Sequence, residues 1–86
     1  MEEKIIDCRK IRTKEDLHRI FREALGFPEH YGNNLDALHD CLTEITGKVR
    51  LIDWETAEAR LGTYGLKAKK VIAAAALHNT GLDLYI

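Results

Sequence analysis

The segment TKEDLHRIFREALG, residues 13–26, carries the clearest structural signal in the chain. Thr13 is followed three residues later by Asp16, so its hydroxyl can accept from the Asp16 amide while the carboxylate reaches back, as in a capping box. Gly26 can adopt the left-handed conformation that ends a helix. The apolar residues between recur at helical spacing: Leu17, Ile20, Phe21, Ala24 and Leu25. This segment is therefore predicted to be an amphipathic helix.

Segments of strand character alternate with helical segments on either side of this helix. The expected strands are KIID (4–7), KVRLIDW (48–54) and LDLYI (82–86). Further helices are expected from a cap at Asn33 or Asn34 to about Thr46, closed by Gly47, and at 55–60 and 66–80. Strands separated by helices connect through right-handed crossovers. The alternation predicts an α/β fold: a small three-stranded parallel sheet packed by about four helices.

Size and composition exclude several classes of protein. A chain of 86 residues supports one hydrophobic core, hence a single domain spanning 1–86. The longest apolar run, 71–77, falls far short of the roughly 20 residues of a membrane span. The start MEEKIIDC lacks the features of a secretory signal, so a cytoplasmic location is expected. Cys8 and Cys41 are too few for a disulfide framework and are expected to be small buried residues.

Acidic residues are concentrated in one part of the chain. Residues 28–46 contain no Lys or Arg and four acids, which are Glu29, Asp36, Asp40 and Glu44. The other ten acids and all thirteen bases lie elsewhere in the chain. The net charge of −1 gives no sign of a basic nucleic-acid-binding face. Pro28 and Gly32, the latter expected at positive φ, indicate a loop before the second helix.

The second helix is predicted to have two distinct faces. At about 100° per residue from Leu35, one side holds the apolar residues: Leu35, Leu38, Cys41, Leu42 and Ile45. The other half holds Asp36, His39, Asp40, Thr43 and Glu44. Carboxylates four residues apart repel each other, and no nearby base offsets them. Such a face suits a basic cleft, where carboxylates can accept paired hydrogen bonds from arginine as phosphate oxygens do.

FPEHYGNNLDALHDCLT, residues 27–43, resembles the signature of the barstar family of intracellular ribonuclease inhibitors. The similarity extends to IRTKEDLH (11–18), LIDW (51–54) and the closing strand. It implies a barstar-like fold of three parallel strands packed by helices. It also implies that the acidic helix and its preceding loop plug the active site of a small, basic, secreted microbial ribonuclease, one to one, and protect the bacterial host.

The resemblance further implies which residues contact the enzyme. Asp40 matches the family's central acid, which takes the place of the substrate phosphate, and Asp36 matches a supporting acid. The other expected partner-binding residues are Asn34, Gly32, His30, His39, Thr43, Tyr31 and Glu44.

The chain departs from the barstar pattern at four positions. His30 and His39 replace bulky aromatic residues that pack on the enzyme, Ile45 replaces a tryptophan, and Ala76 aligns with a further acid. A small ribonuclease other than barnase could accept His39 as a flat, partly polar ring.

Other functions have weaker support in the sequence. His39 and Cys41 lie about 200° apart around their helix, and no CxxC or HxxxH spacing exists, so no metal and no cofactor are expected. Asp36 and Asp40 on a convex face form no cleft, so neither an enzyme nor a small-molecule substrate is expected. The remaining alternative is a barstar-fold interaction domain with a non-ribonuclease partner.

Two histidines and the lysines near the C-terminal end are interpreted structurally. His18 is expected to be a packing or surface residue, and His78 to cap the end of its helix. Lys67, Lys69 and Lys70 are interpreted as a solvated helix flank rather than a nucleic-acid contact.

Overall fold

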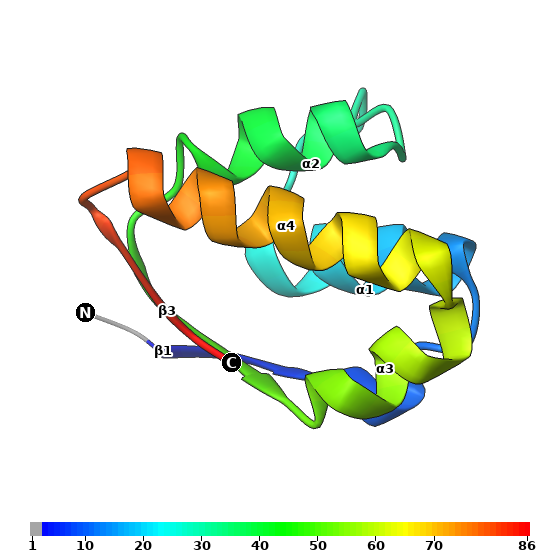
Figure 1. Ribbon diagram of the computed structural model, residues 1–86. Coiled ribbons are helices and arrows are strands. Elements are labelled where there is room, and N and C mark those ends of the chain that lie inside the picture. Colours follow the sequence, from blue (N-terminus) through cyan, green and yellow to red (C-terminus); the bar gives the residue numbers. More distant parts are fainter. Residues whose placement is uncertain (1–2) are drawn as a thin grey trace.

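The computed structural model describes residues 3–86 and contains a three-stranded sheet with four α-helices (Figure 1). The elements are β1 (Glu3–Asp7), the 3₁₀ turn η1 (Cys8–Lys10), α1 (Lys14–Leu25), α2 (Leu35–Leu42), β2 (Gly47–Ile52), α3 (Trp54–Leu61), α4 (Thr63–His78) and β3 (Leu82–Tyr85). The strand order is β1-β2-β3, and both pairs are parallel. The predicted α/β fold is confirmed.

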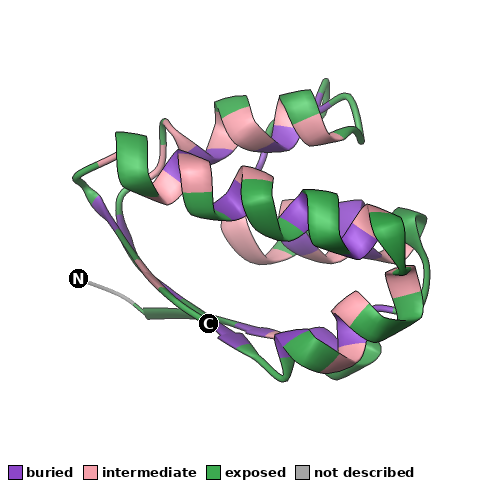
Figure 2. Ribbon diagram, viewed as in Figure 1, coloured by how far each residue is buried: buried purple, intermediate pink, exposed green. Residues whose placement is uncertain are grey.

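The core lies between the sheet and the helices. In Figure 1, α1, α2 and α4 lie on one side of the sheet, and α3 lies near its end. Figure 2 shows buried positions on the surfaces that these elements turn toward one another. The largest fully buried side chains include Ile6, Leu17, Phe21, Leu38, Leu42 and Ile72. Within residues 3–86, no helix is long and apolar enough to cross a membrane.

The other face of the sheet is open to solvent. Ile5, Arg50 and Tyr85 are neighbours in register across the three strands. Ile5 is 55% exposed and Tyr85 45%. The Arg50 guanidinium lies 5.5 Å from the centroid of the Tyr85 ring and 3.1 Å from a Glu3 carboxylate oxygen. A parallel sheet is usually covered on both faces, whereas this one carries a mixed polar and apolar surface on its second face.

The predicted cap of α1 is present with one difference. The Thr13 hydroxyl accepts from the Asp16 amide at 3.1 Å, and Gly26 ends the helix at φ 69°. The Asp16 carboxylate accepts from the amide of Arg12, one residue before the position that a capping box uses. A side-chain hydrogen bond from Arg19, and then the backbone amides of Arg12 and Thr13, hold the pKa of the Asp16 carboxyl below its usual value.

The turn before α2 differs from the prediction at Gly32. Gly32 is not in the left-handed region; Asn33 is, at φ 53°. Asparagine is among the few residues besides glycine that tolerate this conformation. Space provides a separate reason for glycine at 32, because a Cβ there would lie 3.1 Å from the Asn34 side-chain nitrogen. A larger residue at 32 would therefore press on the side chain that caps α2.

Helix α2 ends at Leu42, four residues earlier than the predicted end at about Thr46. The Asn79 side-chain amide donates to the carbonyls of Leu42 and Ile45, at 2.9 and 2.7 Å. These two carbonyls therefore accept hydrogen bonds from a side chain outside the helix. The Glu44 amide donates to the Cys41 carbonyl at 3.2 Å, which forms a tight turn after the helix. Gly47 does not close the helix; it begins β2, at φ 108°.

Helices α3 and α4 are separated by a single residue, Gly62, so α4 begins three residues before the predicted start at 66. Gly65 in the first turn of α4 allows this close connection. A Cβ on Gly65 would lie 2.8 Å from the Glu58 Cα and carbonyl oxygen. The Trp54 indole at the start of α3 is buried and donates to the Glu58 carboxylate at 3.1 Å.

Candidate functional site

The loop 28–34 and helix α2 bring most of the expected partner-binding residues onto one part of the molecule, at the top of Figure 1. We define the docking surface as the members of this set that reach solvent: His30, Gly32, Asn34, Asp36, His39, Asp40, Thr43 and Glu44. His39 and Thr43 are half-buried and the rest are exposed. Whether these residues contact a partner stays a prediction.

Asn34 joins the loop to the helix. Its side-chain oxygen accepts from the Ala37 amide at 2.8 Å, and its side-chain nitrogen donates to the Gly32 carbonyl at 3.3 Å. An asparagine N-cap of this kind satisfies an otherwise unpaired amide in the first helical turn. The expected cap is therefore confirmed at Asn34, and it fixes Gly32 relative to α2.

Asp40 projects from the last turn of α2 into solvent. Its side chain is 82% exposed, and the neighbouring ionisable group is His39, whose Nδ1 lies 3.8 Å from an Asp40 carboxylate oxygen. The Thr43 hydroxyl donates to the Asp40 backbone carbonyl at 2.7 Å, so this bond leaves the carboxylate oxygens unused. Asp40 is thus available to donors from another molecule.

The electrostatics of the docking surface are unfavourable within the isolated chain. Across residues 3–86, no Lys or Arg forms an ion pair with Asp36, Asp40 or Glu44. Asp36 lies in the first turn of α2, where the helix dipole favours an acid. Asp40 lies near the opposite end, where the dipole disfavours it. Glu44 is not on the helix as predicted; it lies in the turn that follows.

A small hollow opens beside Asp40. It has a volume of about 220 Å³ and lies between the loop and α2. Its lining residues are Pro28, His30, Tyr31, Gly32, Ala37, Asp40, Cys41 and Glu44. Ligand pockets usually measure about 300–1,000 Å³, so this hollow suits a single side chain better than a small molecule. Two carboxylates at its margin favour a cationic side chain.

Tyr31 belongs to the core rather than to the exposed docking surface, since only 5% of it is exposed. Its hydroxyl lies 2.6 Å from His18 Nδ1, and its ring centroid lies 5.0 Å from that of Phe27. Burial raises the pKa of the Tyr31 phenol. Tyr31 is thus the loop residue whose side chain enters the core, and its contact with His18 holds the loop against α1.

His18 is a buried polar residue that joins three parts of the fold. It is 2% exposed, and its Nε2 lies 2.6 Å from the Tyr64 hydroxyl in α4. A neutral imidazole can donate from one nitrogen and accept at the other, which satisfies both tyrosine contacts. Burial lowers the pKa of His18 and favours this neutral form. The sequence alone does not decide whether His18 lies in the core or at the surface. The helical pattern also gives no sign that Tyr64 is its hydrogen-bond partner.

His39 and His78 face each other across the contact between α2 and α4. Their ring centroids lie 6.4 Å apart in an edge-on arrangement. His78 is the last residue of α4, but the capping residue is Asn79, so the cap expected at His78 is wrong. Within residues 3–86, no group of three or more His, Cys, Asp or Glu residues is arranged to hold a metal ion.

The two cysteines differ in exposure. Cys8 is fully buried as expected, and burial raises the pKa of its thiol to about 12. Cys41 is half-buried rather than buried, and it lines the hollow beside Asp40. Burial, together with the charges of Glu44 and Asp40, raises the pKa of the Cys41 thiol and disfavours the thiolate that nucleophilic chemistry needs.

Comparison with known proteins gives a family match over nearly the whole chain. The family model described as "Barstar (barnase inhibitor)" matches residues 1–84. The chain belongs to the barstar family. A relative from Bacillus subtilis (strain 168), named "Putative ribonuclease inhibitor YrdF", is 38% identical over 78 residues, which cover 87% of this chain and 86% of the relative.

Membership of the barstar family confirms that the chain is not an enzyme, since the family consists of inhibitors. It also supports ribonuclease inhibition as the general activity. Two of the departures from the barstar pattern lie at sites with little exposed surface. Ile45 and Ala76 are both half-buried and pack against the core.

Proposed function

We propose that this protein inhibits a small basic ribonuclease by inserting the docking surface into the enzyme's active site, with the Asp40 carboxylate in place of the substrate phosphate. The observation that carries the proposal is the state of Asp40: it is exposed, adjoined by two further acids, and without a Lys or Arg counter-ion in residues 3–86. Its carboxylate faces solvent beside His39 and is therefore free to accept hydrogen bonds from cationic groups of a partner.

A ribonuclease active site supplies the missing cations. An enzyme that binds RNA phosphates must present positively charged donors, and a carboxylate can accept two parallel hydrogen bonds from one guanidinium group. Asp36 and Glu44 extend the negative charge on both sides of Asp40. Opposite charges on the two proteins would accelerate their encounter and align them before contact.

The hollow beside Asp40 gives the partner a second point of attachment. A cationic or imidazole side chain of the enzyme would enter between Asp40 and Glu44, above Tyr31. Because the docking surface forms one continuous patch, one inhibitor would block one enzyme. In this proposal the protein acts in the bacterial cytoplasm, before the ribonuclease is secreted.

The alternative is a barstar-fold domain with a non-ribonuclease partner. It is favoured by the replacements at His30 and His39, which remove aromatic surface from the docking surface, and by the loss of an acid at Ala76. The same replacements also fit a ribonuclease other than barnase.

The test is inhibition of a panel of small secreted microbial ribonucleases by the wild-type protein and by Asp40→Ala. Removing one member of a buried charge pair costs about 3–5 kcal/mol, so Asp40→Ala should weaken inhibition by about a hundredfold or more. Asp83→Ala is the matched control, because Asp83 is an exposed acid in β3, outside the docking surface.

Two outcomes would count against the proposal. Failure of the wild-type protein to inhibit any enzyme in the panel would favour the non-ribonuclease partner. Inhibition that is equally strong with Asp40→Ala and Asp83→Ala would retain the inhibitor but reject Asp40 as the phosphate substitute.

A further inference from the structure

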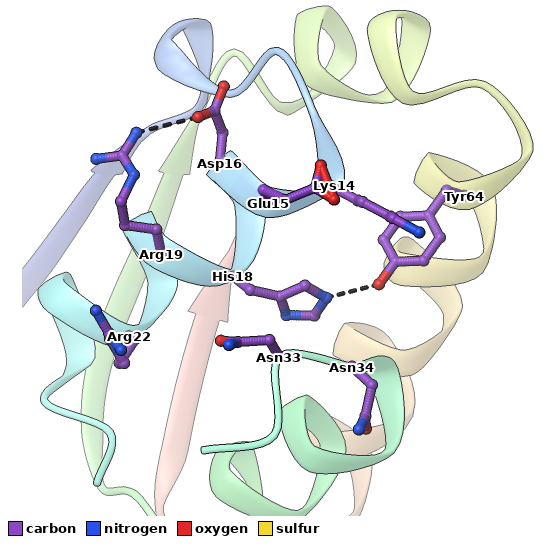
Figure 3. A pocket seen from close by; sticks show the side chains of 9 residues that line it. All are labelled: Lys14, Glu15, Asp16, His18, Arg19, Arg22, Asn33, Asn34 and Tyr64. Atoms are coloured by element: carbon purple, nitrogen blue, oxygen red, sulfur yellow. Dashed lines mark hydrogen bonds and ion pairs between the residues drawn. The ribbon is translucent and has the colours of Figure 1, made fainter. Parts of the chain in front are cut away.

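A second cavity, larger than the hollow beside Asp40, shares no lining residue with that hollow and shares only Asn34 with the docking surface. It has a volume of about 520 Å³ and lies between α1, the loop and the start of α4 (Figure 3). This volume falls within the about 300–1,000 Å³ of typical small-molecule sites. The cavity is therefore large enough for a ligand that the sequence did not predict.

Two cations in the cavity wall have no anionic partner. Lys14 and Arg22 both line the cavity, and neither forms an ion pair within residues 3–86. Arg19 and Asp16 also line it, but their charges offset each other at 3.1 Å. The carboxylate of Glu15 reduces the remaining charge to about +1. This small positive surplus favours a single phosphate group over a polyphosphate.

The remaining lining suits a flat polar ring. Tyr64 presents a partly exposed aromatic ring, while His18 is buried at the base of the cavity with its Nε2 2.6 Å from the Tyr64 hydroxyl. In Figure 3 the Asn33 side chain lies beside His18, on the side toward Arg22. The Asn33 amide makes no hydrogen bond within residues 3–86. An asparagine amide can donate and accept side by side, the pattern that pairs with adenine.

The backbone of Asn33 fixes the point at which this side chain leaves the loop. Asn33 holds a left-handed conformation at φ 53°, and its neighbour Asn34 is fixed as the cap of α2. A site built on such a constrained residue requires little rearrangement to bind a ligand.

We propose that this cavity binds a purine nucleoside monophosphate, with the base against Tyr64 and the Asn33 amide and the phosphate near Lys14 or Arg22. The site does not depend on ribonuclease inhibition, since all four of these residues lie outside the docking surface and the hollow beside Asp40. Glu15 would accept hydrogen bonds from the ribose hydroxyls.

The test is calorimetric titration of the intact protein, without any ribonuclease, with adenosine 5′-monophosphate, adenosine or inorganic phosphate. The nucleotide should bind saturably, and each fragment at least about tenfold more weakly, since each lacks one set of contacts. Amide chemical shifts of Asn33, His18 and Tyr64 should move during the nucleotide titration. Binding of phosphate as tight as that of the nucleotide would overturn the proposal, as would the absence of saturable binding.

Matched variants locate the site. One of the variants Arg22→Ala and Lys14→Ala should weaken nucleotide binding by about tenfold, because it removes the charged donor of the phosphate, and the other should weaken it less. Lys14 is exposed, so its removal tests the site even if Arg22→Ala proves unstable. Lys67→Ala removes an exposed lysine of α4 outside the cavity and should leave binding unchanged. Equal losses in all three variants would indicate unspecific attraction and would contradict the proposal.

Discussion

The imidazole of His18 and the hydroxyl of Tyr64 lie 2.6 Å apart, although 46 residues separate them in the chain. Because the other ring nitrogen contacts Tyr31, two hydrogen bonds connect α1, the loop 28–34 and α4. At 2.6 Å each contact is short enough for a hydrogen bond. A single buried side chain therefore determines how the loop sits on two helices.

Removal of the Tyr64 hydroxyl should destabilise the protein. Tyr64→Phe keeps the ring but leaves a nitrogen of the buried His18 without its partner, which costs about 1–3 kcal/mol. Urea denaturation of the wild type and the variant measures this difference. Tyr85→Phe is the control, since Tyr85 is exposed on the open face of the sheet, and its effect should stay within about 0.5 kcal/mol. Equal stability of the two variants would be the contrary result.

Mild acid should weaken the folded state through His18. Burial lowers the pKa of His18 from its ordinary value of 6.5, so the unfolded chain takes up a proton that the folded chain resists. The stability that neutral His18 contributes is therefore complete above pH 6.5 and is lost as pH falls toward the folded pKa. The free energy of unfolding should drop between pH 7.5 and 5.5 by more in the wild type than in His18→Gln.

A direct titration checks the same prediction without a variant. The His18 ring resonances, followed by NMR against pH, should show a midpoint below 6.5. A midpoint at or above 6.5 would mean that folding does not disfavour the charged imidazole, whatever the unfolding data show.

Adding one methyl group at Gly65 should be destabilising. Gly→Ala within a helix normally gains about 1 kcal/mol, but here the new Cβ would lie 2.8 Å from backbone atoms of Glu58. Overpacking of this kind costs about 1–3 kcal/mol and should outweigh the helix propensity. Thermal unfolding should show a lower Tm for Gly65→Ala. Lys67→Ala, an exposed alanine substitution in the same helix, should change Tm little, so a raised Tm in Gly65→Ala would show that α3 and α4 can separate freely.

Glu44 and Asp40 should affect inhibition in different ways if the proposed complex forms. Glu44 lies at the margin of the docking surface, so Glu44→Gln should mainly slow association and reduce its salt dependence. Asp40→Asn should mainly speed dissociation, because the partner's buried cations lose their counter-ion. Stopped-flow association at several salt concentrations separates the two effects. Identical kinetic changes in both variants would argue against a central position for Asp40.

Local patterns predicted the elements of this fold but not all of their ends. The Thr13 cap, the Gly26 stop and the apolar spacing between them identify α1, because all of these signals act within one or two helical turns. The end of α2 depends on Asn79, which lies more than thirty residues beyond it in the chain. No local pattern contains that information.

The candidate site shows the same division. The two faces of α2 follow from helical periodicity, and the exposure of Asp40 agrees with it. The roles of His18 and Tyr64 depend on two helices meeting in space, and the left-handed residue of the loop is Asn33 rather than the glycine beside it. At position 32 a Cβ would come close to the Asn34 side chain, a contact that exists only because Asn34 caps α2.

The anchoring of the loop affects how tightly any partner can be held there. Tyr31 fixes the loop from below through His18, and Asn34 fixes its end through the cap of α2. A segment already held in one shape has little conformational entropy left to lose on association. More of the interaction energy gained at Asp40 would then appear as affinity, and a partner would find a rigid template instead of a chain that must first be ordered.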